Sequence, residues 1–240
     1  MPAMLIASVI PPGGWHISLG VACGATYACA MAGLLLAALC WMVWHLAPHN
    51  ISMLAFEKEA IAHGEWWRLW TAHFTHFSHA QLIINSAMLT VAGLIAGRYT
   101  KIWQLIFSLL TAMPIIAGLL LLTSPHLLFF RGATGIAAMM WVLAAWFLLV
   151  EEKRFSWRYW VGLCFLLLFT GKAGMEGLIL LSPDSHRMSG FQAAWLAQLY
   201  GALLGMAFFN GLHQLHMTRN EKNPQYRGPY ERLPERRRSK

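Results

Sequence analysis

Six apolar runs, each near the length of a membrane-crossing helix, constrain this chain more than any other feature. A helix needs roughly 20 consecutive apolar residues to cross the hydrocarbon core of a bilayer. Of the 240 residues, 58% are hydrophobic and only 12% are charged, which is too few charges for a soluble domain. We expect spans at residues 21–45, 80–97, 102–122, 132–150, 160–181 and 191–212. The predicted fold is an all-α membrane protein, a bundle of six transmembrane helices.

The distribution of charge between these runs predicts the topology. Residues 217–240 contain eight lysines and arginines against three glutamates, and the connections after the second and fourth runs are also basic. Cytoplasmic loops of membrane proteins are rich in these residues. We therefore expect a multi-pass protein of the inner or cytoplasmic membrane, with both termini cytoplasmic. Residues 1–20 form an N-terminal segment, residues 21–212 the membrane domain and residues 213–240 a basic, disordered tail.

The tail and the histidines raise two binding hypotheses. A basic tail can bind nucleic acid or acidic lipid, but a topology anchor is the simpler interpretation, and we expect no nucleic-acid partner. His73, His76 and His79 are spaced by three residues, and imidazole is a common metal ligand. Because no carboxylate or cysteine lies nearby to complete a ligand set, we expect neither a metal nor a cofactor.

The segment before the second run is typical of a membrane interface. Trp66, Trp67 and Trp70 lie close together, and tryptophan is enriched at the depth of the lipid headgroups. Glu65 and Arg68 are spaced as neighbours on one helix face, and we expect both to face water.

Several polar side chains interrupt the apolar runs. An isolated polar group in lipid costs several kcal/mol, so we expect Gln81, Asn85, Thr134 and Gln198 to gather around a wet pocket. Lys172 and Glu176 are spaced i, i+4 in the fifth run, which favours an ion pair. Such a pair either packs helices or lines a water-filled cavity, or it takes part in chemistry.

The stretch from Gly64 to His76, followed by an apolar run that contains Asn85, resembles the first loop and second span of the rhomboid intramembrane serine proteases. The Trp66-Trp67-Arg68 stretch and the six-span layout resemble the rhombosortase branch in particular. The resemblance covers residues 64–211. It implies a six-helix membrane fold, and it implies transmembrane segments or C-terminal anchor segments of other membrane proteins as partners within the lipid bilayer.

The position of the rhomboid nucleophile carries a different residue here. Rhomboids have Gly-x-Ser-Gly at the start of the fourth span, and this chain has Gly132-Ala133-Thr134-Gly135. Threonine has a hydroxyl that can act as a nucleophile, but its extra methyl restricts the side chain and crowds the path of attack. Small residues in an apolar helix also serve close helix packing, so the glycines alone do not establish a catalytic site.

The partner positions are altered as well. The resemblance places a catalytic histidine before two glycines on the sixth span, where this chain has Gln198, Gly201 and Gly205. It also implies that Asn85 and a residue four positions earlier bind the oxyanion, and Gln81 stands there in place of histidine. A side-chain amide can orient a hydroxyl but cannot take its proton near neutral pH.

Two functions follow from this pattern, and a third class is weaker. The leading hypothesis is an inactive rhomboid-like protein that binds transmembrane segments without cutting them. The alternative is an active endopeptidase that uses Thr134 as nucleophile and processes the C-terminal anchors of surface proteins. Lys172 is one candidate base for it, and His76 and His79 flank the second span on the appropriate side. The third class is a small transporter or a purely structural membrane protein. Transporters often show internal repeats and broken helices, and the sequence indicates neither.

Overall fold

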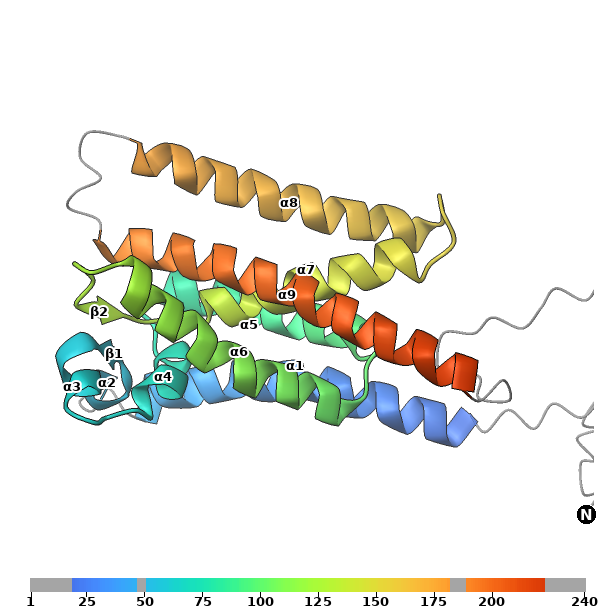
Figure 1. The fold of residues 1–240 in the computed structure, drawn as a ribbon, viewed down its shortest axis with the longest axis horizontal. Helices are drawn as coiled ribbons and strands as arrows, with labels where there is room; N and C mark the ends of the chain where they lie inside the picture. The colour runs from blue at the N-terminus through green and yellow to red at the C-terminus, as the bar shows by residue number, and fades with distance from the viewer. Residues whose placement is uncertain (1–18, 47–50, 182–188, 223–240) are drawn as a thin grey trace, which may run out of the picture.

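Six long helices form most of the part of the chain that the structure describes. The computed structural model describes residues 19–46, 51–181 and 189–222, and the side chains of residues 31–46, 51–181 and 191–215. The helices lie side by side (Figure 1), with α1 beginning and α9 ending at the same end of the bundle. Their bounds are α1 (Leu19–Leu46), α5 (His79–Ala96), α6 (Ile102–Thr123), α7 (Thr134–Val150), α8 (Trp157–Leu180) and α9 (Ser189–Lys222).

Four of the described helices are long and apolar enough to cross a membrane. These stretches are His79–Ala96, Ile102–Thr123, Trp157–Leu180 and Phe191–Leu215. The shorter apolar stretches Met31–Leu46 and Thr134–Val150 correspond to the first and fourth predicted spans. The all-α membrane class is therefore supported, whereas the count of six spans and the cytoplasmic placement of the termini remain predictions.

The connection between α1 and α5 is more structured than the sequence predicted. It holds α2 (Ile51–Leu54), β1 (Phe56–Glu57), α3 (Lys58–Ala62), α4 (Arg68–Thr71) and the 3-10 helix η1 (Ala72–Phe74). Strand β1 pairs antiparallel with β2 (Phe129–Phe130), which precedes α7. The sequence showed no strand pattern here, because two residues are too few to produce one. The pairing joins this connection to the segment that enters α7.

Arg68 holds this connection together from inside, so the expectation that it faces water was wrong. Only 5% of Arg68 is exposed. Its guanidinium donates to the carbonyls of Ser52 and Ala55 at 2.5 and 2.8 Å and to the Glu65 carboxylate at 2.6 Å. A planar group with five donors can satisfy several acceptors at once, and the carbonyls of an irregular segment need such donors.

Proline explains how the same connection attaches to α6. Pro114 lies inside α6 and has no N–H, so the carbonyl of Leu110 loses its helical partner. The Trp70 indole donates to that carbonyl at 3.0 Å. One turn further on, His73 Nε2 lies 2.9 Å from the Met113 carbonyl. The aromatic segment is thus fixed to the bundle by the polar groups of its side chains.

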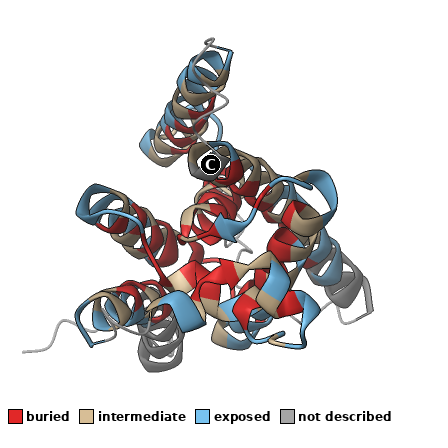
Figure 2. Ribbon diagram, turned by 90° about the vertical axis from the view of Figure 1, so that its left-hand side faces the viewer, coloured by how far each residue is buried: buried red, intermediate tan, exposed pale blue. Residues whose placement is uncertain are grey.

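Helix α7 is the core of the bundle and α8 its most exposed flank. Twelve of the 17 residues of α7 are buried, against four of the 24 in α8. The buried residues of α8 (Gly162, Phe165, Phe169 and Ala173) form one narrow stripe. The helix stands apart from the others in Figure 1, and end-on in Figure 2 it carries little buried surface. Lipid tails are as apolar as its outer residues, so this exposure carries no penalty in a bilayer.

Helix α9 continues past its predicted end. We expected the sixth span to end at residue 212 and a disordered tail to follow, but α9 is helical to Lys222. His213 Nδ1 lies 3.0 Å from the Glu151 carboxylate, and its ring stacks on Phe209. These contacts favour helix beyond the apolar run. Residues 1–18 of the predicted N-terminal segment and residues 223–240 of the predicted tail lie outside the described residues.

Candidate functional site

The backbone before α7 makes a turn that requires glycine. Gly132 has a φ of +132°, in the region that L side chains rarely adopt. A Cβ added at Gly132 would also collide with the side-chain amide of Gln81. The Gly132 N–H donates to the Ala72 carbonyl at 3.1 Å. This turn sets Thr134 as the first residue of α7, at the end of the bundle that holds the α1–α5 connection (Figure 1).

The other framing glycines bring α7 and α9 into backbone contact. A Cβ on Gly201 would collide with the Gly135 carbonyl oxygen. A Cβ on Gly205 would lie 2.5 Å from the Met139 carbonyl oxygen, and one on Gly135 2.9 Å from that of Ala197. No side chain fits at these distances. The spacing of small residues seen in the sequence thus corresponds to close packing of the two helices that carry Thr134 and Gln198.

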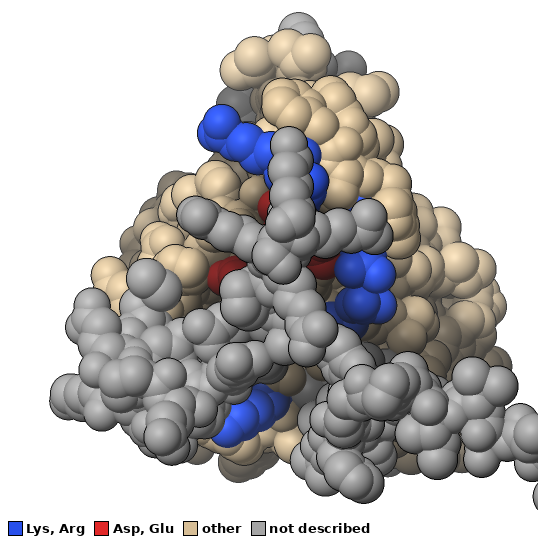
Figure 3. All heavy atoms as spheres, turned by 90° about the vertical axis from the view of Figure 1, so that its right-hand side faces the viewer, with Lys and Arg blue, Asp and Glu red and all other residues tan. Residues whose placement is uncertain are grey.

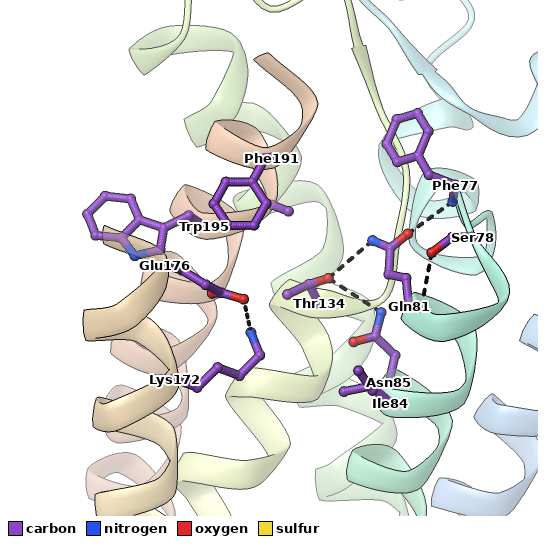
Figure 4. Close-up of a pocket in the computed structure, with 11 residues that line it drawn as sticks. Phe77, Ser78, Gln81, Ile84, Asn85, Thr134, Lys172, Glu176, Phe191 and Trp195 are labelled. Carbon is purple, nitrogen blue, oxygen red and sulfur yellow. Dashed lines mark hydrogen bonds and ion pairs between the residues drawn. The ribbon is translucent and has the colours of Figure 1, made fainter. Parts of the chain in front are cut away.

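Two side-chain amides surround the hydroxyl of Thr134. Asn85 Nδ2 lies 3.4 Å from Thr134 Oγ1, and Gln81 Nε2 lies 3.5 Å from it (Figure 4). The orientation of Gln81 is fixed at both ends, because its Nε2 donates to the Arg131 carbonyl at 3.1 Å and its Oε1 accepts from the Phe77 N–H at 3.0 Å. Ser78 caps α5 by accepting from the Gln81 N–H. Thr134 Oγ1 therefore accepts weak hydrogen bonds from two neutral donors.

His76 stands behind Asn85. Only 2% of it is exposed, and burial lowers its pKa from 6.5 to about 4. Its Nε2 lies 3.3 Å from Asn85 Nδ2 and 3.5 Å from the Ala133 N–H. Since both neighbours are donors, Nε2 is the unprotonated nitrogen that accepts from them. The ring supports Asn85, and no hydrogen bond between the described His76 and Thr134 side chains is present.

His79, the other histidine that flanks the second span, has a different neighbour. Its ring lies 4.6 Å from the ring of Trp44 on α1. His79 is the first residue of α5, and its ring packs against α1 rather than with Asn85 and Thr134.

Gln198 belongs to a second polar network. Its side chain is buried, with 1% exposed. Lys172 Nζ donates to Gln198 Oε1 at 2.5 Å and to Glu176 Oε1 at 2.6 Å, and Gln198 Nε2 donates to Glu176 Oε2 at 3.2 Å. Both polar atoms of the Gln198 amide are thus engaged by α8. Among the described residues, the side-chain hydrogen bonds of Gln198 go to this ion pair and none goes to Thr134.

One pocket separates the two networks. It measures about 430 Å³ and lies between the start of α5, the start of α7, the end of α8 and the start of α9. Figure 4 shows Thr134, Gln81 and Asn85 on one side and Lys172 with Glu176 on the other. The remaining lining residues are Phe77, Ser78, Ile84, Phe191, Ala194 and Trp195. Three of the four polar residues expected to cluster therefore line one pocket. Gln198 does not line it, but its side chain is bonded to Lys172 and Glu176, which do.

Comparison with known families agrees with this architecture. A family model described as Rhomboid domain matches residues 63–214, more than half of the chain. The chain belongs to the rhomboid family. The family resemblance predicted from residues 64–211 is thereby confirmed, and the protein is a rhomboid-like integral membrane protein of the multi-pass kind. A search of curated proteins found no match.

Two contacts of this rhomboid were not predicted from the sequence. The first is the support of Asn85 by His76, although the three-residue spacing of the histidines marks that segment. The second is the engagement of Gln198 by Lys172 and Glu176. The i, i+4 spacing predicted the ion pair, which is present at 2.6 Å, but nothing in the sequence linked that pair to a residue 22 positions further on.

Proposed function

We propose that this rhomboid has lost peptide hydrolysis and binds transmembrane or C-terminal anchor segments of other membrane proteins. The proposal rests on one observation. Among the described side chains, the hydrogen-bond partners of Thr134 Oγ1 are the amides of Gln81 and Asn85. A nucleophilic hydroxyl needs a base within hydrogen-bond reach to take its proton. Amide nitrogens donate hydrogen bonds and have no lone pair to offer.

The other candidate bases support the same conclusion. Gln198 stands at the family's histidine position and is bonded to Lys172 and Glu176 instead of Thr134. His76 contacts Asn85, and with a pKa near 4 it is a weak base. An imidazole that contacts the hydroxyl only through an amide does not complete a proton relay, because the amide cannot pass the proton on.

The pocket supports the binding half of the proposal. It combines aromatic and aliphatic residues (Phe77, Ile84, Phe191 and Trp195) with a few polar groups, the usual composition of a site that takes a largely apolar ligand. Helix α8, which forms one wall, is buried along only one stripe. A segment from a neighbouring membrane protein suits this lining, and the Trp-Trp-Arg resemblance favours an anchor of the rhombosortase type.

Proteolysis and binding are tested separately. The full chain, reconstituted in liposomes, is incubated with a rhomboid substrate and with a protein bearing a glycine-rich C-terminal anchor. We expect no cleavage and no labelling by a fluorophosphonate. A photo-crosslinking residue at Ile84 should capture the anchor segment, whereas one at Leu167, an exposed position on α8 outside the pocket, should not. Absence of crosslinks at Ile84 would refute the binding half.

Variants test the reason for inactivity. Nucleophile and base act as a unit, so restoring one alone recovers little. Thr134→Ser and Gln198→His should each stay inactive, and the double variant is the one that regains cleavage. Cleavage by the unmodified chain that disappears in Thr134→Ala would overturn the proposal.

Lys172 is the candidate base for the alternative function, an active endopeptidase. Lys172 and Thr134 line the same pocket, and hydroxyl–lysine pairs are known nucleophile–base combinations. The ammonium of Lys172 is held by Glu176 and Gln198, so it would have to leave both to serve as a base. Activity that is lost in both Thr134→Ala and Lys172→Ala would establish this alternative.

A further inference from the structure

A second groove runs between α5 and α8 at the opposite end of the bundle from Thr134. It measures about 370 Å³ and lies where α5 ends and α8 begins. Its apolar lining comes from Leu94, Ile95, Leu148 and Val161. Arg98, Trp157 and Arg158 complete the lining. The groove therefore has an apolar part and a part lined by cationic and aromatic side chains.

The two arginines differ in how they are held. Arg158 donates to the Glu152 carboxylate at 3.1 Å, and its guanidinium lies 5.3 Å from the centre of the Trp157 ring. Arg98 is exposed and has no ion pair with any residue that the structure describes. A guanidinium has five donors, so Arg158 keeps donors for a further acceptor after binding Glu152.

The positive charges of Arg98 and Arg158 both act on the hydroxyl of Tyr99. That hydroxyl donates to Glu152 at 2.6 Å. Burial raises the pKa of Tyr99, the Glu152 carboxylate raises it further, and the charges of Arg98 and Arg158 act in the opposite direction. Both guanidinium groups therefore lie within electrostatic range of the same hydroxyl.

Positive charge is in excess around the groove. The two described connections at this end and the start of α8 carry Arg98, Lys101, Lys153, Arg154 and Arg158, against Glu151 and Glu152. Glu151 is engaged by His213, and Glu152 by Tyr99 and Arg158. Figure 3 looks onto this end, where blue lysine and arginine side chains surround the few red acidic ones. Among the described residues, the basic side chains at this end outnumber the acidic ones, which favours an anionic ligand.

We propose that the α5–α8 groove binds one anionic phospholipid, with its phosphate between Arg98 and Arg158 and an acyl chain along Leu94, Ile95, Leu148 and Val161. Basic pockets between membrane helices on the cytoplasmic side suit anionic headgroups, and arginine binds phosphate with two parallel donors. Trp157, 71% exposed, has the amphipathic ring that favours headgroup depth. A soluble phosphate would leave the apolar length of the groove uncovered, so the occupant is a lipid.

Binding is measured on the purified full chain in mild detergent, by native mass spectrometry and by thermal unfolding with added lipid. Phosphatidylglycerol should bind and raise the unfolding temperature, and phosphatidylcholine should bind at least about tenfold more weakly because its headgroup has no net charge. Soluble glycerol phosphate should not stabilise the protein. Equal binding of the two lipids, or equal stabilisation by glycerol phosphate, would overturn the proposal.

Charge variants localise the site. Arg98→Gln with Arg158→Gln should weaken phosphatidylglycerol binding about tenfold. Lys153→Gln with Arg154→Gln removes the same charge from the same end, outside the groove, and should change binding less than about twofold. If loss of Arg158 unfolds the protein, Arg98→Gln alone is measured instead, since Arg98 lacks an ion pair among the described residues. It should still weaken phosphatidylglycerol binding. Equal losses in the two double variants would mean diffuse attraction and would refute the site.

Discussion

The two walls of the pocket are built on different chemistry. On the α5–α7 wall, Thr134, Gln81 and Asn85 meet through neutral hydrogen bonds of 3.4 to 3.5 Å, with a neutral histidine behind them. On the α8–α9 wall, Lys172, Glu176 and Gln198 form a charged network with contacts of 2.5 to 3.2 Å. The positions that would hold nucleophile and base in the family thus belong to separate networks. We infer that each network now stabilises its own pair of helices.

The packing that links the walls is expected to be the most sensitive point. Gly201→Leu would drive a side chain into the Gly135 backbone and separate α9 from α7, so we expect loss of the folded protein. Gly211→Leu lies on the same helix and faces open space, and it should fold normally. Yield and thermal unfolding of the two variants in detergent measure the difference. A stable Gly201→Leu protein would contradict the backbone contact on which both walls depend.

Acid should destabilise the histidine that supports the neutral wall, His76, and a second buried histidine of the same segment, His73. Burial lowers the pKa of His73 and of His76 from 6.5 to about 4. Protonation therefore favours the unfolded chain, and the stability from each neutral ring is present above pH 6.5 and lost as pH falls toward 4. Between pH 7 and pH 5 we expect a loss of about 2 kcal/mol for each histidine, measured by unfolding in mixed micelles.

Substitution identifies the groups responsible for this pH dependence. His76→Gln should reduce the slope of stability against pH below 6.5. His63→Gln changes an exposed histidine of the same connection and should leave the slope as it was. A slope that is the same in both variants would mean that His76 does not carry the effect.

Removing one charge should damage the charged wall. Glu176→Gln leaves the Lys172 ammonium without its anion. Breaking a fully buried pair costs about 3–5 kcal/mol, and because these side chains are 33% and 22% exposed we expect about 2 kcal/mol. The double variant Lys172→Gln with Glu176→Gln leaves no unpaired charge and should lose less. If the single variant proved as stable as the parent, the Lys172–Glu176 ion pair would not be what stabilises this wall.

The smallest effect should come from the hydroxyl itself. Thr134→Val keeps the shape of the side chain and removes the acceptor for two amides. Their hydrogen bonds are long, so we expect a loss of about 1 kcal/mol. Thr170→Val is the matched control, since Thr170 bonds only to carbonyls of its own helix turn and is exposed. If Thr134→Val lost as much stability as Glu176→Gln, the two walls would not differ in strength as proposed.

The sequence by itself determined the membrane class, the family and the glycine frame. Each of these depends on local pattern, because an apolar run predicts a span and small residues at fixed spacing predict close helix packing. The match over residues 63–214 agrees with the stretch from which the family was predicted. The boundaries of the long helices could be expected to within a few residues, apart from the end of α9.

Only the tertiary structure decided which groups the polar side chains contact. Asn85 meets Thr134 from 49 positions away, and Lys172 meets Gln198 across 26. Arg68 fills the acceptors of an irregular segment, and Trp70 satisfies a carbonyl that Pro114 leaves free. The residue types state what each group can donate or accept, but its partner depends on which helices pack together. That choice is made by the burial of α7 against α5, α8 and α9, and a hydrophobic pattern does not encode such pairwise contacts.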